Sequence, residues 1–391
     1  MAVRSLPASL PQCCHTGSAG TRPYNPVLPV PTFGGEGGGP FAAKWRRSDA
    51  SLPQPARGVS SMKSLHILGN HRVEIAEFPL PEPKANEVLV KVAASGVCGG
   101  EMHAFRGENA MAMNGGHEVS GIVADPNGHP QWDEGDRVGV FTLGGCGKCR
   151  WCRMGRDTFC EEVGTPAACH SEYIAVRANA MVKLADDVSA GAAVLLCGDG
   201  LGVPYGGTVR AGVGKGDVTC VFGCGPVGLG MVLMQRFMGC WPIAVEPVEA
   251  RRKLALRVGA WQTIDPAAEE NLTARLRELT DGIGPDACFE CSGRQDTLDC
   301  AMDATKCEGI ICQVGHGKQQ LDPQKLIIKR NLTIFGNWVS HPGWYPDMLC
   351  LYRQGLPIER LITLETSFEN AQEAYSRLEQ GLEGKVILTW A

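Results

Sequence analysis

The sequence predicts a two-domain α/β protein in which a β-rich domain precedes a doubly wound parallel sheet. Two patterns carry this prediction. Between residues 62 and 204, short segments alternate apolar and polar residues, which is typical of half-buried strands. From about residue 205, continuous apolar strands alternate with helical segments, which indicates a parallel sheet covered by helices on both faces. The 391 residues, 44% of them hydrophobic, are enough for two domains with large cores.

The first domain, residues 62–204, is expected to consist of short antiparallel strands. Residues 87–99 alternate as a strand does. Residues 118–141 are predicted to form two strands joined by a turn, with Asn127–Gly128 as the hairpin signal. Residues 339–391 contain two helical segments and a last strand, and we expect this tail to return to the first domain.

The second domain, residues 205–338, is expected to repeat strand and helix. The predicted strands are 217–225, 241–247, 262–266, 286–293, 309–315 and 332–338, and the predicted helices are 226–239, 248–259, 269–280 and 297–306. Because these strands are apolar throughout, we expect them to be buried on both faces.

Residues 1–61 differ from the rest of the chain. They are rich in Pro, Gly, Ser and Arg, contain only Glu36 and Asp49 as acids and lack periodicity, so we expect a disordered leader. One interpretation is an organelle transit peptide. We favour a non-native upstream extension with Met62 as the natural start, because no convincing amphipathic helix is found.

The composition argues against several classes of protein. A net charge of −5 argues against a protein that mainly binds nucleic acid or acidic membranes. No apolar run is long enough to cross a bilayer. The 18 cysteines are spread out, many of them in apolar segments, which favours small buried thiols over a disulfide framework. We therefore expect a reducing, cytoplasmic environment.

The segment GCGPVG ends an apolar strand and opens a helix, which is the context of a dinucleotide-binding turn. Gly223 permits the turn, Gly225 lets the backbone approach a pyrophosphate, and Gly228 lets helix and sheet pack closely. The helix N-terminus supplies N–H groups for phosphate. The alternative is a glycine-rich turn that binds no ligand.

The second strand of this domain ends at Glu246. A carboxylate there can bind both ribose hydroxyls and repels a 2′-phosphate, so NAD is favoured over NADP. Arg251 and Arg252 lie nearby and weaken that preference. The predicted cofactor-binding residues of this domain are Gly223, Gly225, Pro226, Val227, Gly228, Glu246 and Arg251.

Two further motifs contain residue types that bind metals. Within 144–160, four cysteines follow the spacing C-x2-C-x2-C-x7-C: Cys146, Cys149, Cys152 and Cys160. The spacing alone leaves open an iron–sulfur site, a zinc knuckle that binds nucleic acid, two disulfides or a structural staple. Elsewhere Cys98, His117 and Cys197 offer two thiolates and one imidazole, the donors of a zinc site with an open fourth position. Spacing does not show whether these three converge.

These motifs, together with GDRV at 135–138 and GKVIL at 384–388, resemble the zinc-containing medium-chain alcohol and polyol dehydrogenases, a group that includes sorbitol, threonine and butanediol dehydrogenases. The resemblance covers residues 62–391. It implies a GroES-like catalytic domain and a Rossmann domain with the active site between them. It also implies NAD, two zinc ions per chain, a small alcohol substrate and a homo-oligomer, either a dimer or a tetramer.

Carried over to this chain, the resemblance implies that Cys98, His117 and Cys197 bind the catalytic zinc, with Glu118 close to the metal. Glu101 stands where the family usually has Asp, and we expect its carboxylate to accept the free N–H of His117. The four cysteines of 144–160 are expected to form the family's closed structural zinc site.

One position departs from the family pattern. Members commonly place Ser or Thr two residues after the first zinc cysteine, where the hydroxyl passes on the alcohol proton, but this chain has Gly100. His103 is present where the family often has His, and we expect water and His103 to form the relay, with Ser95 as a weaker candidate. Lys385 stands where a basic residue near the pyrophosphate is common.

The implied reaction is hydride transfer between NAD and a secondary alcohol, a polyol or a hydroxy amino acid. Candidate residues for the substrate cleft are Trp338, His341, Trp344 and His170. Two rival hypotheses are a zinc-independent, NADP-dependent reductase of the same superfamily and a non-catalytic NAD-binding or zinc-scaffold protein. The two zinc motifs and Glu246 argue against the reductase, and an assay of NADH formation separates an enzyme from a scaffold.

Overall fold

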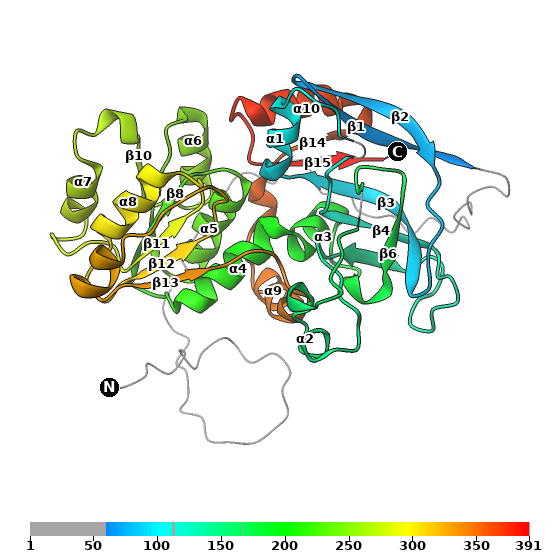
Figure 1. Ribbon diagram of the computed structural model, residues 1–391, viewed down its shortest axis with the longest axis horizontal. Coiled ribbons are helices and arrows are strands. Elements are labelled where there is room, and N and C mark those ends of the chain that lie inside the picture. The colour runs from blue at the N-terminus through cyan, green and yellow to red at the C-terminus, as the bar shows by residue number, and fades with distance from the viewer. Residues whose placement is uncertain (1–59, 112–113, 167, 391) are drawn as a thin grey trace, which may run out of the picture.

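Two domains lie side by side in the computed structural model, which describes residues 60–111, 114–166 and 168–390 (Figure 1). The predicted leader lies outside these residues, apart from its last two, and strand β1 begins at Ser61. Among the described residues, no helix is long and apolar enough to cross a membrane.

The first domain is built on a seven-stranded sheet in the order β14-β15-β3-β4-β5-β7, with β6 paired to β3. A separate antiparallel hairpin, β1–β2, lies beside it (Figure 1). The strands are β1 (Ser61–Gly69), β2 (Arg72–Pro79), β3 (Glu87–Val97), β4 (Val119–Asp125), β5 (Arg137–Val140), β6 (Tyr173–Arg177), β7 (Met181–Lys183), β14 (Ile362–Ser367) and β15 (Lys385–Thr389). The predicted strand at 87–99 is found as β3, although it is buried on both faces over much of its length and alternates only around residues 90–94. Strand β15 pairs with it in antiparallel register.

The predicted hairpin at Asn127–Gly128 needs a correction. Both residues have positive φ, 49° and 70°, as the sequence suggests. However, β4 ends at Asp125 and β5 begins only at Arg137, so the turn is the first part of a longer loop. The Asn127 side chain donates to the carbonyls of Pro83, Lys84 and Glu87, which anchors this loop to the start of β3.

The second domain contains six parallel strands in the order β10-β9-β8-β11-β12-β13. The strands are β8 (Val218–Phe222), β9 (Trp241–Val245), β10 (Gln262–Ile264), β11 (Ala287–Glu290), β12 (Ile310–Gln313) and β13 (Thr333–Gly336). The order reverses between β8 and β11, and ligands of such sheets bind at the carboxyl ends of the strands beside this switch point. The predicted α/β class, with a β-rich domain and a doubly wound parallel sheet, is confirmed.

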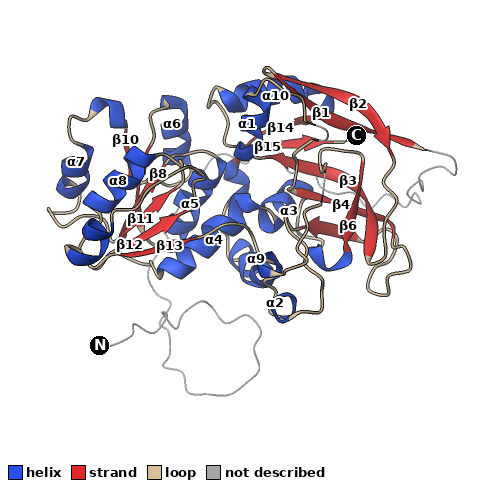
Figure 2. Cartoon of the chain, viewed as in Figure 1, coloured by secondary structure: helices blue, strands red, loops and turns tan. Residues whose placement is uncertain are grey.

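Helices cover the parallel sheet and connect the two domains (Figure 2). They are α1 (Met102–Arg106), α2 (Arg150–Arg153), α3 (Ala190–Cys197), α4 (Asp199–Ala211), α5 (Pro226–Phe237), α6 (Glu249–Arg257), α7 (Leu272–Glu278), α8 (Gln295–Ala304), α9 (Tyr345–Arg353) and α10 (Ala371–Glu379). One hydrophobic core runs from α3 and α4 into α5 and the parallel sheet, with Leu196, Leu201 and Met231 among its buried members. This shared core fixes the first domain against the second.

The turn between β8 and α5 has the geometry that its glycines predict. Gly223 has a φ of +87°, a conformation that residues with side chains rarely adopt. A Cβ atom added to Gly228 would clash with the carbonyl oxygen of Gly223, so helix and turn approach as closely as backbone allows. A Cβ atom on Gly225, by contrast, would meet nothing within 4 Å.

This contrast predicts different outcomes for two alanine substitutions in one turn. Gly228→Ala should lower the free energy of unfolding by about 3 kcal/mol or more, the upper end of overpacking costs, because backbone must move. Gly225→Ala should leave stability within about 0.5 kcal/mol, as an open site allows. Thermal unfolding of the ligand-free protein measures both, and equal losses in the two variants would contradict the packing described here.

Candidate active site and metal centres

A cleft of 1890 Å³ lies between the two domains. Cys98, His117 and Glu118 line it from the first domain, and Gly225 and Glu246 line it from the second. The cleft therefore places the cysteine–histidine motifs and the glycine-rich turn on walls that face one space.

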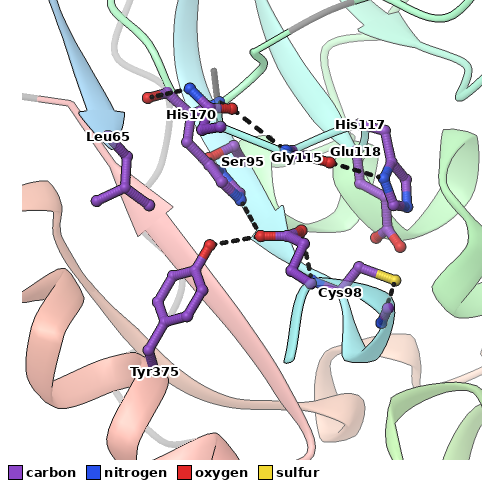
Figure 3. A network of polar contacts seen from close by, with 12 residues as sticks. Leu65, Ser95, Cys98, Gly115, His117, Glu118, His170 and Tyr375 are labelled. Carbon is purple, nitrogen blue, oxygen red and sulfur yellow. Dashed lines mark hydrogen bonds and ion pairs between the residues drawn. The ribbon is translucent and has the colours of Figure 1, made fainter. Parts of the chain in front are cut away.

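Cys98, His117 and Glu118 converge at the floor of this cleft (Figure 3). One ligand atom from each lies within 4.8 Å of the others. Cys98 follows β3, and the Gly100 N–H lies 3.5 Å from its sulfur. His117 lies two residues before the start of β4, and its Nδ1 donates to the Gly115 carbonyl at 3.1 Å. That bond leaves Nε2 as the free imidazole nitrogen, which is the usual arrangement in a metal-binding histidine.

The electrostatics of this group favour a bound cation. Burial alone would lower the pKa of His117, but the Cys98 sulfur and the Glu118 and Asp199 carboxylates raise it to about 10. The imidazole is thus surrounded by groups that stabilise positive charge. A thiolate, an imidazole and carboxylates are also ligands that zinc prefers, so these residues fit a zinc ion.

The expectation that Cys197 is a ligand is wrong. Cys197 is the last residue of α3 and is fully buried in the hydrophobic core. Its sulfur faces Gly139, where an added Cβ atom would clash with it. Helix α3 ends there because Gly198 adopts an extended conformation, and the chain restarts as α4 in a new direction.

Asp199, the first residue of α4, lies beside His117 in the cleft, where Cys197 does not reach. It lines the cleft, and its Oδ2 lies 3.7 Å from His117 Nε2. Its Oδ1 accepts from the Ser340 amide at 3.0 Å and from the Thr142 hydroxyl at 3.3 Å, so Oδ2 is held toward the imidazole. Burial and the nearby Glu118 raise the pKa of Asp199 to about 6, although His117 opposes the shift. Sequence analysis missed Asp199, although a carboxylate two residues from a proposed ligand was a visible signal.

The expected bond between Glu101 and His117 is also wrong. The Glu101 carboxylate instead accepts from the Cys98 amide at 3.0 Å, contacts His170 Nε2 at 2.9 Å and accepts from the Tyr375 hydroxyl (Figure 3). Burial would raise the pKa of Glu101, but its interactions with His170 lower it to about 2. The longer Glu side chain passes beneath the His117 loop rather than meeting its imidazole.

Glu118 forms an ion pair with Lys385, and both side chains are 1% exposed. Lys385 was expected near the pyrophosphate, but here its ammonium group is paired beside the metal-ligand group, at the wall of the cleft. Removing one partner of such a buried pair typically costs 3–5 kcal/mol, roughly, because the other charge stays buried. A cofactor contact for Lys385 stays a prediction.

The four cysteines Cys146, Cys149, Cys152 and Cys160 form the second group that can hold a metal, with their sulfurs within 4.8 Å of one another. Backbone N–H groups point at the sulfurs, as from Cys146 to Cys160 at 3.3 Å and from Cys149 to Cys146 at 3.4 Å. Hydrogen bonds from backbone amides to its sulfur, of which that from Lys148 has the largest effect, lower the pKa of Cys146 to about 7. Four converging thiols with amide donors fit a closed zinc site.

The four-cysteine lobe contacts the loop that leads into α9. The Gly343 amide donates to the Gly155 carbonyl at 3.0 Å, and Thr158 is hydrogen-bonded to His341 Nδ1 at 2.9 Å. His341 also packs against the Trp344 ring, with 4.2 Å between centroids. Of the four candidates for the substrate cleft, Trp338 lines it, whereas His341 contacts the lobe and Trp344 packs against His341 and Tyr205. His170 is fully buried behind the metal-ligand group.

Of the residues expected on the proton path, His103 and Gly100 lie at the cleft and Ser95 does not. His103 on α1 is exposed and lines the cleft, as does Gly100. A Cβ atom on Gly100 would meet only Cys98 Sγ, at 3.8 Å, so the missing side chain leaves open space. Ser95, the weaker relay candidate, is fully buried and bonded to His170 Nδ1 at 2.7 Å, which removes it from this path.

Glu246 directly follows β9 and is 3% exposed. Its carboxylate accepts from the Cys224 amide at 2.7 Å and the Val248 amide at 3.0 Å. These bonds use two of about four lone-pair positions on the carboxylate and fix it beside the glycine-rich turn. Arg251 lines the same part of the cleft, whereas Arg252 is paired with Asp265 at 3.1 Å.

A β-rich domain and a doubly wound sheet that share a cleft, with a zinc-type ligand set on one wall and a dinucleotide turn on the other, define a two-domain zinc-type dehydrogenase. The comparisons with known proteins agree. Residues 84–186 match the alcohol dehydrogenase GroES-like domain, and residues 226–354 match the zinc-binding dehydrogenase domain. The chain belongs to the zinc-binding medium-chain alcohol dehydrogenase family, as its motifs predict.

The similarity to individual relatives extends over nearly the whole length of each relative. An L-threonine 3-dehydrogenase of Pyrococcus abyssi is 32% identical over 348 residues, 84% of this chain and 97% of that enzyme. A sorbitol dehydrogenase of Halalkalibacterium halodurans is 29% identical and covers 84% of this chain and 98% of its own. The structure of the alcohol dehydrogenase RspB from Escherichia coli CFT073 with NADH superposes with a TM-score of 0.74 at 26% identity, over 85% of this chain and all of its own (100%).

A matched pair of substitutions distinguishes the roles of Asp199 and Cys197 in zinc binding. Asp199→Ala should weaken zinc binding at the cleft by more than roughly 100-fold, because loss of even an outer partner of a metal site costs 10–100-fold. Cys197→Ala should leave zinc binding within about twofold and affect only stability. Zinc content after competition with a chromogenic chelator measures both variants, and loss of zinc in Cys197→Ala alone would restore the original assignment.

Proposed function

We propose that this protein is an NAD-dependent dehydrogenase that uses zinc to oxidise a secondary alcohol, a polyol or a hydroxy amino acid, or to catalyse the reverse reaction. One observation carries the proposal: the Cys98–His117–Glu118 group and the Gly223–Gly228 turn line a single cleft between the domains. The threonine and sorbitol dehydrogenases among its relatives support this range of substrates.

The metal would be held by Cys98 and His117, with Asp199 and Glu118 in reach of the same position. When bound, zinc acts as a Lewis acid on the substrate oxygen, and NAD takes the hydride. The Gly115 carbonyl fixes the tautomer of His117, and Ser340 and Thr142 fix the rotamer of Asp199. Lys385 compensates the charge of Glu118, which limits the negative charge near the substrate oxygen.

The four-cysteine lobe would hold a second zinc with a structural role, giving two per chain. The cofactor would lie across the carboxyl ends of β8 and β9, with its pyrophosphate at the N-terminus of α5. Glu246 lines this part of the cleft, where its carboxylate would accept hydrogen bonds from the ribose hydroxyls. We also propose a homo-oligomer in the cytoplasm, in keeping with the family resemblance.

The alcohol proton needs a path from the cleft floor to solvent. Gly100 leaves the first position of that path open, and His103 stands exposed on the same wall. We propose that water occupies the space beside Gly100 and that His103 receives the proton.

Absorbance at 340 nm with a panel of alcohols, polyols and hydroxy amino acids tests the proposed function. We expect NADH formation with at least one secondary alcohol and loss of that activity in His117→Ala. A protein that binds NAD and two zinc ions but oxidises nothing in the panel would favour the scaffold hypothesis, and activity that survives complete zinc removal would favour the zinc-independent reductase.

Cofactor preference is expected to depend on Glu246. The wild type should have the higher kcat/KM with NAD, because a buried carboxylate repels the 2′-phosphate of NADP. Glu246→Ser should reduce that preference, with Arg251 free to contact the phosphate. A wild-type preference for NADP would contradict this assignment.

The proton path gives a second pair of expectations. His103→Ala should lower kcat at neutral pH by roughly 10²-fold, the lower end for general acid–base catalysis, and by less at high pH, where hydroxide takes the proton. Gly100→Thr should keep or raise activity on simple secondary alcohols, because its Cβ meets only Cys98 Sγ. An unchanged pH profile in His103→Ala would remove His103 from the path.

A further inference from the structure

A buried polar cluster lies directly behind the metal-ligand group of the cleft (Figure 3). It consists of Ser95 on β3, Glu101 at the start of α1, His170 before β6 and Tyr375 on α10. Three of these side chains are fully buried and Glu101 is 4% exposed. Burying an imidazole, a carboxylate and two hydroxyls is unfavourable unless each group is hydrogen-bonded. Apolar side chains would fill this space at lower cost, so the polar groups are expected to have a role other than packing.

His170 is the centre of this cluster, because both of its ring nitrogens have partners. Nδ1 is 2.7 Å from the Ser95 hydroxyl, and Nε2 is 2.9 Å from Glu101 Oε2. Its backbone is fixed as well, since the Leu65 amide donates to the His170 carbonyl at 2.8 Å. The imidazole therefore has one defined orientation.

Through Glu101, His170 supports the loop that carries Cys98. The same carboxylate that contacts His170 accepts from the Cys98 amide at 3.0 Å through its other oxygen, Oε1. Tyr375 also donates to Oε2. Two donors thus fix the carboxylate on one side, and the carboxylate fixes the backbone of the metal-binding cysteine on the other.

His170 also supports the loop that carries His117. A Cβ atom on Gly116 would lie 2.7 to 2.9 Å from three ring atoms of His170, so the imidazole packs flat against the peptide that precedes His117. The Asn114 side-chain oxygen accepts from both the His170 amide and the Gly116 amide, each at 3.2 Å. The two loops that supply Cys98 and His117 therefore share His170 as a common support.

We infer that His170 is a positioning residue for the catalytic metal: acting through Glu101 and through Gly116, it sets the separation of the Cys98 sulfur and the His117 imidazole. This inference rests on the zinc site of the proposed function. His170 touches neither the substrate nor the metal in this arrangement. Its effect on the reaction is the geometry that it imposes on two ligands that lie on different loops.

The Glu101 side chain is long enough for its carboxylate to contact both the Cys98 amide and His170. An aspartate at this position, the residue type expected from the family pattern, is one methylene shorter than the glutamate that spans from the Cys98 amide to His170. The glutamate at 101, His170 and Tyr375 therefore act as one unit, in which the effect of one residue depends on the presence of the others.

His170→Phe tests the inference, because phenylalanine keeps a flat, slightly larger ring against Gly116 and lacks both ring nitrogens. His170→Gln is the conservative partner, since its amide retains a donor toward Glu101. Thr219→Val is the control for general destabilisation: it removes a buried hydrogen bond to Gln235 in the second domain, 2.6 Å long, far from the cleft. Full-length, zinc-loaded protein is used for all three.

The first readout is metal affinity, measured by competition with a chromogenic chelator that resolves the two zinc ions. We expect His170→Phe to weaken the cleft site by 10–100-fold, roughly, the range for outer partners of metal sites, and to leave the four-cysteine site unchanged. His170→Gln should recover at least part of the loss. Thr219→Val should lower the melting temperature without changing either site.

The second readout is the double-mutant cycle of His170→Phe with Glu101→Gln. If His170 acts through Glu101, the combined fold-loss in zinc affinity is smaller than the product of the two single losses. Independent, multiplicative losses would overturn the route through Glu101. If His170→Phe does not fold, Tyr375→Phe, which removes one donor to the same carboxylate, takes its place with a smaller expected loss.

The results separate this inference from the proposed function. A wild type that holds no zinc in the cleft refutes the catalytic zinc site itself. A wild type that holds two zinc ions, with cleft affinity within twofold in His170→Phe, refutes only the positioning role. Equal loss from both sites, in step with the melting temperature as in Thr219→Val, also refutes it, because that result is general destabilisation.

Discussion

The concentration of negative charge at the floor of the cleft is the constraint on which the rest of the first domain depends. The Cys98 sulfur and two carboxylates, those of Glu118 and Asp199, lie around the imidazole of His117 in a largely buried place. Such groups repel one another and stay together only if cations and hydrogen bonds compensate them. Lys385 neutralises one carboxylate, and backbone amides and hydroxyls hold the rest. The surrounding strands and loops supply these compensating groups.

The sequence predicted the architecture and the four-cysteine group because each has a local signature. Alternation in β3, apolar strands after residue 205 and the GCGPVG turn depend on neighbours in the chain, which pattern rules describe. The four cysteines lie within 144–160, so their spacing alone places them close together. The positive φ values at Asn127 and Gly128 were likewise visible in their residue types, although the length of the loop that follows them was not.

The errors occurred where side-chain direction depends on distant parts of the fold. Cys197 and Asp199 lie two residues apart, and only the helix break at Gly198 decides which of them faces the cleft. Glu101 was assigned to His117 because the two are linked in the family pattern. Its side-chain partners instead come from the loop before β6 and from α10, which no local rule connects to residue 101. Which buried polar side chains pair with one another depends on the packing of the whole domain. Sequence analysis therefore identifies the polar residues and not their hydrogen-bond partners.

The pairing of β15 with β3 joins residue 386 to residue 97, with the entire parallel-sheet domain between them in the chain. The second domain is contiguous and can fold while the chain is still being synthesised. In the first domain, β3 can pair with β4 and β6 earlier, but its pairing with β15 and the Glu118–Lys385 ion pair require the C-terminal strand. The ion pair that compensates the charge of Glu118 can therefore form only after the last residues of the chain have left the ribosome.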